Sequence, residues 1–127
     1  MIKKYQMSTF LALFLVMAFV IIGCAPAEQE IIDETLPTEV EVTMQGNQFE
    51  PSGVTIAAGG TVTWINTDNV EHTVTAGTRE SPTGEFDVSL NPGEEFSYTF
   101  DEVGAFEYHC TIHPGMDGTI IVTVIVE

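Results

Sequence analysis

A short segment from Cys110 to Met116 carries three side chains with metal-binding atoms. It reads Cys-Thr-Ile-His-Pro-Gly-Met, so a thiol, an imidazole and a thioether occupy every third position. A second imidazole, His72, lies thirty-eight residues before Cys110. Two histidines and one cysteine, with a methionine as a weak fourth ligand, form a donor set suited to a copper ion that changes oxidation state. His72, Cys110, His113 and Met116 therefore predict a mononuclear copper site, and with it a blue-copper electron carrier.

The sequence on either side of this segment has the pattern of β-strands. From Ala105 to Cys110, apolar and other residues alternate with the period of a half-buried strand. Residues 119–126 form a β-branched run that is typical of a second strand, and Pro114-Gly115 indicates a turn. A tight strand-loop-strand connection would fold Cys110, His113 and Met116 around one point, so the fourth ligand must come from elsewhere in the chain.

At these residues the sequence resembles the cupredoxins, and among them plastocyanin and amicyanin. The similar segments are Val70-Glu71-His72-Thr73-Val74 and the Cys110 segment, together with residues 47–51, 54–56, 59–60 and 62–64 in the expected order. The resemblance covers about residues 39 to 127. It implies an all-β Greek-key sandwich that holds one copper ion near one end through His72, Cys110, His113 and Met116. It also implies that the electron leaves through the edge of His113.

Two features depart from the family pattern. The segment between Cys110 and Met116 is shorter than in plastocyanin and matches the amicyanin-like spacing, so a role in photosynthesis is not carried over. Thr73 stands where many members have an asparagine that joins the two ligand-bearing loops. Thr73 or Thr111 is therefore a candidate for the substitute hydrogen bond.

Other interpretations of the same residues remain open. The chain has two cysteines, so a disulfide between Cys24 and Cys110, or an inert buried thiol, competes with a metal ligand. Zinc could occupy the same ligands, although Met116 would then have no purpose. Strand alternation directs His109 away from Cys110, which predicts a solvent-facing or surface-packed side chain and not a ligand. Met44 belongs to an alternating strand and is expected in the core.

The domain shows short strands separated by turn signals, and no helix of useful length is expected. Evenly spaced strands with one apolar face predict a sandwich of about eight strands in two sheets. The expected strands are residues 39–45, 53–58, 61–66, 72–75, 85–89, 94–100, 104–110 and 118–126. The longest expected loop, residues 76–84, follows the His72 strand and is assigned no ligand.

The beginning of the chain resembles a lipoprotein signal. Lys3-Lys4 precede thirteen apolar residues from Phe10 to Ile22, and Ile21-Ile22-Gly23-Cys24 resembles a lipoprotein cleavage box. We expect a signal peptide over residues 1–23, a lipidated Cys24 with a flexible acidic tether to residue 38, and a copper domain over 39–127. An uncleaved membrane anchor is the alternative, and the tether could instead dock on the domain. Both interpretations of the leader place the domain at the cell membrane, facing the periplasm or exterior.

The charge distribution is the second strong signal in the sequence. All nineteen acidic residues follow Cys24, whereas Arg79 is the only Lys or Arg there. Nucleic acid is therefore a poor partner. Steering toward a basic redox partner, such as a cytochrome or an oxidase, is one explanation. Adaptation to a salty habitat is the other, because dense carboxylates keep a protein soluble there.

Three functional classes follow from these residues. The first is a membrane-tethered carrier that shuttles single electrons, expected to be a monomer and not an enzyme. The second is a copper-handling protein of the cell envelope, such as a chaperone or store. The third, an enzyme, is disfavoured because only His109 is left after His72 and His113 are used. One histidine cannot build the additional copper centre of a multicopper oxidase or nitrite reductase.

Overall fold

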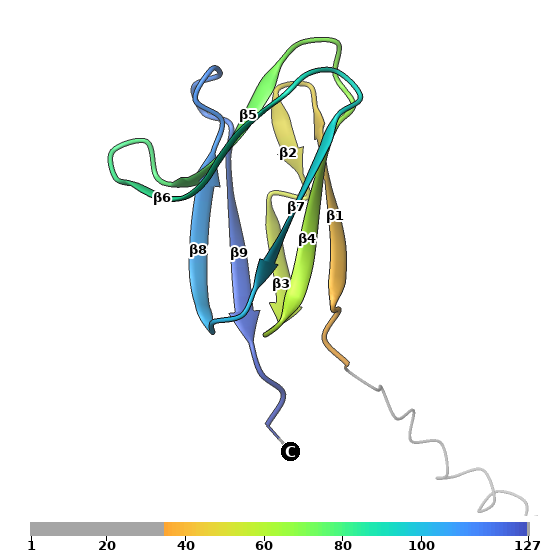
Figure 1. Cartoon of the computed structure of the whole chain (residues 1–127), viewed down its shortest axis with the longest axis vertical. Coiled ribbons are helices and arrows are strands. Elements are labelled where there is room, and N and C mark those ends of the chain that lie inside the picture. Colours follow the sequence, from red (N-terminus) through yellow and green to blue (C-terminus); the bar gives the residue numbers. More distant parts are fainter. Residues whose placement is uncertain (1–34, 127) are drawn as a thin grey trace, which may run out of the picture. The chain divides into compact units, whose positions relative to one another are not determined.

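The computed structural model describes residues 35–126. The expected signal peptide, the lipidated Cys24 and the tether up to residue 34 lie outside the described residues. Nine strands and no helix occur between residues 35 and 126 (Figure 1). The strands are β1 Glu39–Gln45, β2 Gln48–Glu50, β3 Gly53–Ala57, β4 Gly60–Asn66, β5 His72–Gly77, β6 Pro82–Leu90, β7 Glu95–Phe100, β8 Gly104–His109 and β9 Asp117–Thr123. Across this described part of the chain, no helix is long and apolar enough to cross a membrane.

The strands form two sheets, in agreement with the predicted all-β sandwich, and each sheet contains parallel and antiparallel pairs. One sheet has the order β2-β1-β4-β7, and the other has the order β3-β9-β8-β5-β6. β1 pairs with β4 in parallel, and β3 pairs with β9 in parallel, whereas the other neighbours are antiparallel. The antiparallel pairing of β5 with β8 brings His72, at the start of β5, close to the end of β8 in the same sheet.

The core lies between the sheets and is rich in aromatic rings. Side chains of β4 alternate between buried and half-buried positions, which is the period of a strand with one inward face. Trp64 of β4 is fully buried, and its ring contacts Phe96 of the same sheet. It also contacts Phe86 and Tyr108 of the facing sheet. Such aromatic contacts fix the spacing of the two sheets beneath the metal-binding end.

The structure confirms the predicted all-β sandwich and corrects three of its details. β2 was not predicted, because its three residues are too short to show a period. β6 begins at Pro82, three residues earlier than predicted, so the loop after β5 spans only residues 78–81. β9 ends at Thr123, and the apolar residues 124–126 that were expected to continue it are exposed.

The two ends of the domain differ in what they carry. The loop between β8 and β9 and the start of β5 lie at one end, whereas β1 begins and β9 finishes at the other (Figure 1). The candidate metal centre is therefore separated from the start of β1.

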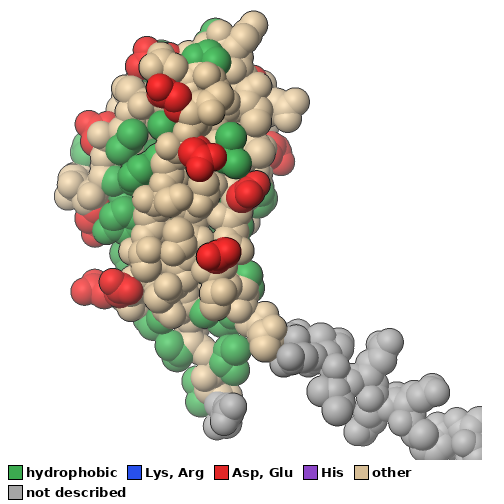
Figure 2. Space-filling view, turned by 45° about the vertical axis from the view of Figure 1, so that its right-hand side comes forward, with side chains coloured by type: hydrophobic (Ala, Val, Ile, Leu, Met, Phe, Trp, Pro, Cys, Tyr) green, Lys and Arg blue, Asp and Glu red, His purple; other side chains and the backbone are tan. Residues whose placement is uncertain are grey.

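Acidic side chains are spread over the face drawn in Figure 2, and no Lys or Arg side chain is visible there.

Candidate metal centre

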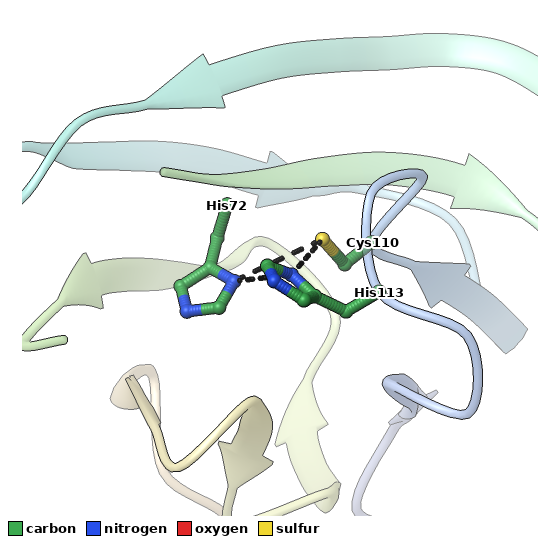
Figure 3. Close-up of side chains that lie close together, drawn as sticks. All are labelled: His72, Cys110 and His113. Carbon is green, nitrogen blue, oxygen red and sulfur yellow. Dashed lines mark hydrogen bonds between the residues drawn. The ribbon is translucent and has the colours of Figure 1, made fainter. Parts of the chain in front are cut away.

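His72, Cys110 and His113 converge at one end of the sandwich (Figure 3). His72 opens β5, Cys110 directly follows β8, and His113 lies on the loop before β9. The two Nδ1 atoms of the histidines are 3.1 Å apart. The sulfur of Cys110 lies 3.9 Å from Nδ1 of His72 and 3.6 Å from Nδ1 of His113. The tertiary fold thus brings together three of the side chains that the sequence predicted as ligands.

Burial distinguishes the four predicted ligands. His72 and Cys110 are fully buried, and Met116 is 1% exposed. His113 is partly exposed, because it lies on the loop that covers the end of the sandwich. Met116 belongs to the same core cluster as Cys110, and its N–H donates to the carbonyl oxygen of His113 at 3.3 Å. The site is closed on the core side and reaches the surface through His113.

Asp68 orients the ring of His72. Its carboxylate lies 2.7 Å from Nε2 of His72 and accepts hydrogen bonds from the backbone N–H groups of Gly46 and Asn47. The Gly46 amide first, and then His72, lower the pKa of Asp68 below its usual value of 3.8. A carboxylate on one ring nitrogen directs the proton to that nitrogen and leaves the other available for a metal. Sequence reasoning missed Asp68, although its position four residues before His72 was a usable signal.

The donor set fits a soft, monovalent or divalent transition metal. Nδ1 of His72, the ring nitrogen that does not contact Asp68, lies near Nδ1 of His113 and the sulfur of Cys110. Electron pairs that converge at such distances repel one another unless a proton or a metal cation lies between them. Two imidazole nitrogens and one thiolate are ligands that suit copper. The arrangement therefore fits a copper ion without rearrangement of the elements that carry it.

Thr73 supplies the hydrogen bonds that the sequence suggested. Its Oγ1 accepts a hydrogen bond from the backbone N–H of Thr111 at 2.8 Å, and the two hydroxyl oxygens are 3.2 Å apart. The N–H of Thr73 itself points at the sulfur of Cys110 at 3.3 Å. The expected substitute for the asparagine of other family members is confirmed, and it involves both threonines.

The two residues that were set aside as non-ligands have different outcomes. Met44 is fully buried in the core, as predicted. His109 lies outside the metal-binding group. Of its two predicted alternatives, solvent-facing or surface-packed, the solvent-facing one was wrong, because the side chain is only 3% exposed. Its Nδ1–H donates to the carbonyl oxygen of Gly77 at 2.7 Å. The hairpin between β5 and β6 covers this side of β8, which strand alternation alone could not reveal.

Comparison with known proteins identifies the family. The sequence model described as "Copper binding proteins, plastocyanin/azurin family" matches residues 37–123. The chain belongs to this family. Among its relatives, plastocyanin of Scenedesmus fuscus is 42% identical over an alignment of 83 residues that covers 58% of this chain and 85% of the relative. Amicyanin-alpha of Methylorubrum extorquens is 34% identical over an alignment of 96 residues that covers 73% of this chain and 79% of the relative.

Solved structures place this member of the plastocyanin/azurin family among the cupredoxins. A purple cupredoxin from Nitrosopumilus maritimus matches with a TM-score of 0.62 and 29% identity, over 66% of this chain and 99% of that chain. A copper-containing nitrite reductase from Thermus scotoductus matches with a TM-score of 0.59 and 30% identity. That match covers 83% of this chain but 26% of the reductase, so it concerns only part of the enzyme. The cofactor of this cupredoxin is accordingly copper.

Proposed function

We propose that this protein shuttles single electrons between redox partner proteins through one copper ion held by His72, Cys110, His113 and Met116. The convergence of two Nδ1 atoms and one sulfur at a single point carries this proposal. Copper supplies the one-electron chemistry, and a ligand set that compromises between the preferences of its two oxidation states limits rearrangement. The relatives named plastocyanin and amicyanin are copper-containing electron carriers, which supports electron transfer and not catalysis for this chain.

The chain contributes a rigid and dry set of ligands. Cys110 would bind the copper ion as a thiolate, and the N–H of Thr73, which lies 3.3 Å from its sulfur, would stabilise the negative charge. Asp68 holds the ring of His72, and the core buries His72, Cys110 and Met116. Buried ligands that are fixed by hydrogen bonds do not relax when the charge of the site changes by one unit. This rigidity favours a carrier over a store that must open to release its ion.

His113 provides the path between the site and a partner. It is the least buried of the proposed ligands, and its neighbours Ile112 and Pro114 are exposed. Ile112 is 47% exposed, which gives the surface around His113 an apolar component. A partner that docks there would reach the copper site through the imidazole ring of His113.

The location is part of the same proposal. The N-terminal sequence favours a lipid on Cys24 and a tether that ends at residue 38, before the copper domain. Thr35 precedes β1, which begins at the end of the domain away from the metal centre (Figure 1). A tether at that point would leave His113 accessible to partners at the outer face of the cell membrane. Replacing Cys24 by Ala should release the protein from the membrane fraction, and retention there would favour the uncleaved anchor.

Spectroscopy on residues 25 to 127 loaded with copper tests the function. We expect an intense visible absorption band and narrow copper hyperfine splitting in spin resonance, lost on reduction and restored on reoxidation. The His113→Ala variant should lose this band. A colourless or tetragonal spectrum in the wild type would overturn the carrier proposal. Copper that passes rapidly to a chelator during redox cycling would favour the copper-handling alternative.

A further inference from the structure

Arg79 is the only Lys or Arg among residues 35–126, and it contacts the loop that carries three proposed ligands. Its guanidinium donates to the backbone oxygens of Cys110 at 2.8 Å, His113 at 2.7 Å and Met116 at 3.3 Å. These three carbonyls belong to the three residues of the loop that supply side-chain ligands. The guanidinium of Arg79 therefore binds the backbone at every position of the loop that supplies a proposed copper ligand.

The loop has few backbone restraints of its own. The N–H of Cys110 donates to the oxygen of Met116 at 3.0 Å, and the N–H of Met116 donates to the oxygen of His113 at 3.3 Å. Arg79 adds three contacts to these two. A guanidinium is planar and presents several donors in a fixed fork, so it can hold several carbonyls at a constant mutual geometry. An ammonium group concentrates its donors at one point and cannot reproduce this arrangement.

The hairpin that carries Arg79 is itself held in place. Gly77 has a φ of 92°, and a Cβ atom there would lie 2.5 Å from the oxygen of Ser81, so the turn requires glycine. Buried His109 donates to the carbonyl oxygen of Gly77, which ties the hairpin to β8 immediately before Cys110. The carboxylate of Asp117 lies 3.3 Å from the guanidinium. The turn at Gly77 and its contact with His109 thus fix the hairpin, and Asp117 holds the guanidinium of Arg79.

We propose that Arg79 is a positioning residue for the copper site, with an effect on its reduction potential. The guanidinium fixes the backbone of Cys110, His113 and Met116, so the ligands keep their places when the electron moves. Its positive charge also disfavours the oxidised state of the site, which carries one more positive charge than the reduced state. The side chain is 28% exposed, so solvent screens part of this charge effect. The inference rests on the ligand set proposed above.

Three variants separate the geometry from the charge. Arg79→Gln removes both the fork and the positive charge, whereas Arg79→Lys keeps the charge and removes the fork. Ser81→Asp changes the net charge by the same amount as Arg79→Gln on the same hairpin, at an exposed position, and leaves the guanidinium in place. The reduction potential of each copper-loaded variant is measured by voltammetry. Hydrogen exchange is measured on each copper-free variant, so that loop order is assessed without the metal.

The two amides to follow are those of Cys110 and Met116. We expect their exchange to become roughly tenfold faster in Arg79→Gln and Arg79→Lys, since several charged hydrogen bonds are lost, while amides of β1 and β4 stay protected. The potential should fall in Arg79→Gln by more than in Ser81→Asp, and should stay closer to the wild type in Arg79→Lys. Unchanged exchange in both Arg79 variants, or a potential for Arg79→Gln equal to that of Ser81→Asp, would overturn the proposal.

The experiment also distinguishes this inference from the proposed function. If the wild type lacks the visible band, the electron-carrier proposal fails, yet the exchange of the copper-free protein still reports whether Arg79 orders the loop. If the band is present and the Arg79 variants behave as the wild type, only the positioning role fails. Should Arg79→Gln not fold, Arg79→Lys provides the same comparison of exchange with its positive charge retained.

Discussion

The hydroxyl of Thr73 accepts a hydrogen bond from the backbone N–H of Thr111 at 2.8 Å. Thr73 follows His72, and Thr111 follows Cys110, so this bond joins the two segments that carry the proposed ligands. Thr73 is 4% exposed, which makes the bond stronger than one at the surface. The side chain of Thr73 therefore adds a link between the two segments to the pairing of β5 with β8 and to the contact of the Thr73 N–H with the sulfur of Cys110.

Replacing Thr73 by Val keeps the shape of the side chain and removes the acceptor. We expect the free energy of unfolding of the copper-free protein to fall by about 1 kcal/mol, because the bond to Thr111 is lost at a nearly buried position. Copper should also dissociate faster, since the two segments can separate. Urea unfolding and transfer of copper to a chelator measure the two effects. Thr73→Ser keeps the hydroxyl and should restore most of the loss, and a Ser variant as weak as Val would contradict this role.

Replacing Asp68 by Asn should weaken copper binding by roughly 10 to 100-fold, the usual effect of removing a partner that orients a histidine ligand. The amide can still accept from one donor but cannot hold His72, Gly46 and Asn47 together. Competition with a copper chelator gives the affinity. Asp101→Asn is the matched control, because Asp101 is exposed at the other end of the domain and the change in charge is identical. Equal losses of copper affinity in the two variants would mean that the change in net charge, and not the contact with His72, causes the effect.

The same carboxylate gives a pH dependence of known sign. Hydrogen bonds, chiefly from Gly46, lower the pKa of Asp68 in the folded protein below the 3.8 of an ordinary aspartate. A group with a depressed pKa stabilises the fold above its unfolded value and loses that contribution as the pH falls. The stability difference between wild type and Asp68→Asn should therefore be complete near neutral pH and shrink below pH 3.8. A difference that persists unchanged in acid would exclude the ionised form as its source.

Replacing Met116 by Gln should leave copper and its colour in place and lower the reduction potential. The amide oxygen is a harder ligand than the thioether, so it favours the oxidised ion. Met44→Leu is the control, because Met44 is equally buried in the core but lies on β1. That variant should keep the potential and cost less than about 1.5 kcal/mol of stability. An unchanged potential in Met116→Gln would remove Met116 from the ligand set.

Replacing Tyr108 by Phe should not destabilise the protein. The hydroxyl of Tyr108 is buried and has no hydrogen-bond partner among the described residues. Burial raises its pKa to about 12, with a smaller opposing effect from Trp64. The free energy of unfolding of the wild type should therefore fall by up to about 1.4 kcal/mol per pH unit above pH 10, because Tyr108 ionises at a lower pH in the unfolded chain than in the folded protein. Urea unfolding at pH 7 and above pH 10 should show this loss in the wild type and in Tyr98→Phe but not in Tyr108→Phe.

The acidic surface predicts a salt-dependent encounter with cationic partners. Electron-transfer rates with a basic cytochrome should fall as the ionic strength rises, because salt screens the attraction between exposed charges. Rates with an uncharged small redox reagent should change little and serve as the control. A flat profile with the basic cytochrome would instead favour acidity as an adaptation to a salty habitat.

The fold class and the candidate ligands of the Cys110 loop could be predicted from the sequence because each rests on a local pattern. Alternation of apolar residues marks strands such as β4 and β8, and the spacing of Cys110, His113 and Met116 lies within one loop. Short or shielded features were not accessible. β2 is too short to show a period, and His109 is buried by a hairpin that its own strand pattern does not reveal.

The sequence by itself determined which side chains could bind copper and that they would lie on strands and one tight loop. Only the tertiary structure decided that His72 meets the ligand loop, because β5 and β8 are neighbours in one sheet. It also decided the supporting contacts: Asp68 on His72, Thr73 on Thr111, and Arg79 on the carbonyls of the loop. Two of these contacts, Thr73 with Thr111 and Arg79 with the loop, join residues more than thirty positions apart. Asp68 is only four residues from His72, but its position also depends on backbone amides of a distant turn. Contacts of this kind follow from strand order and register, which no local pattern specifies.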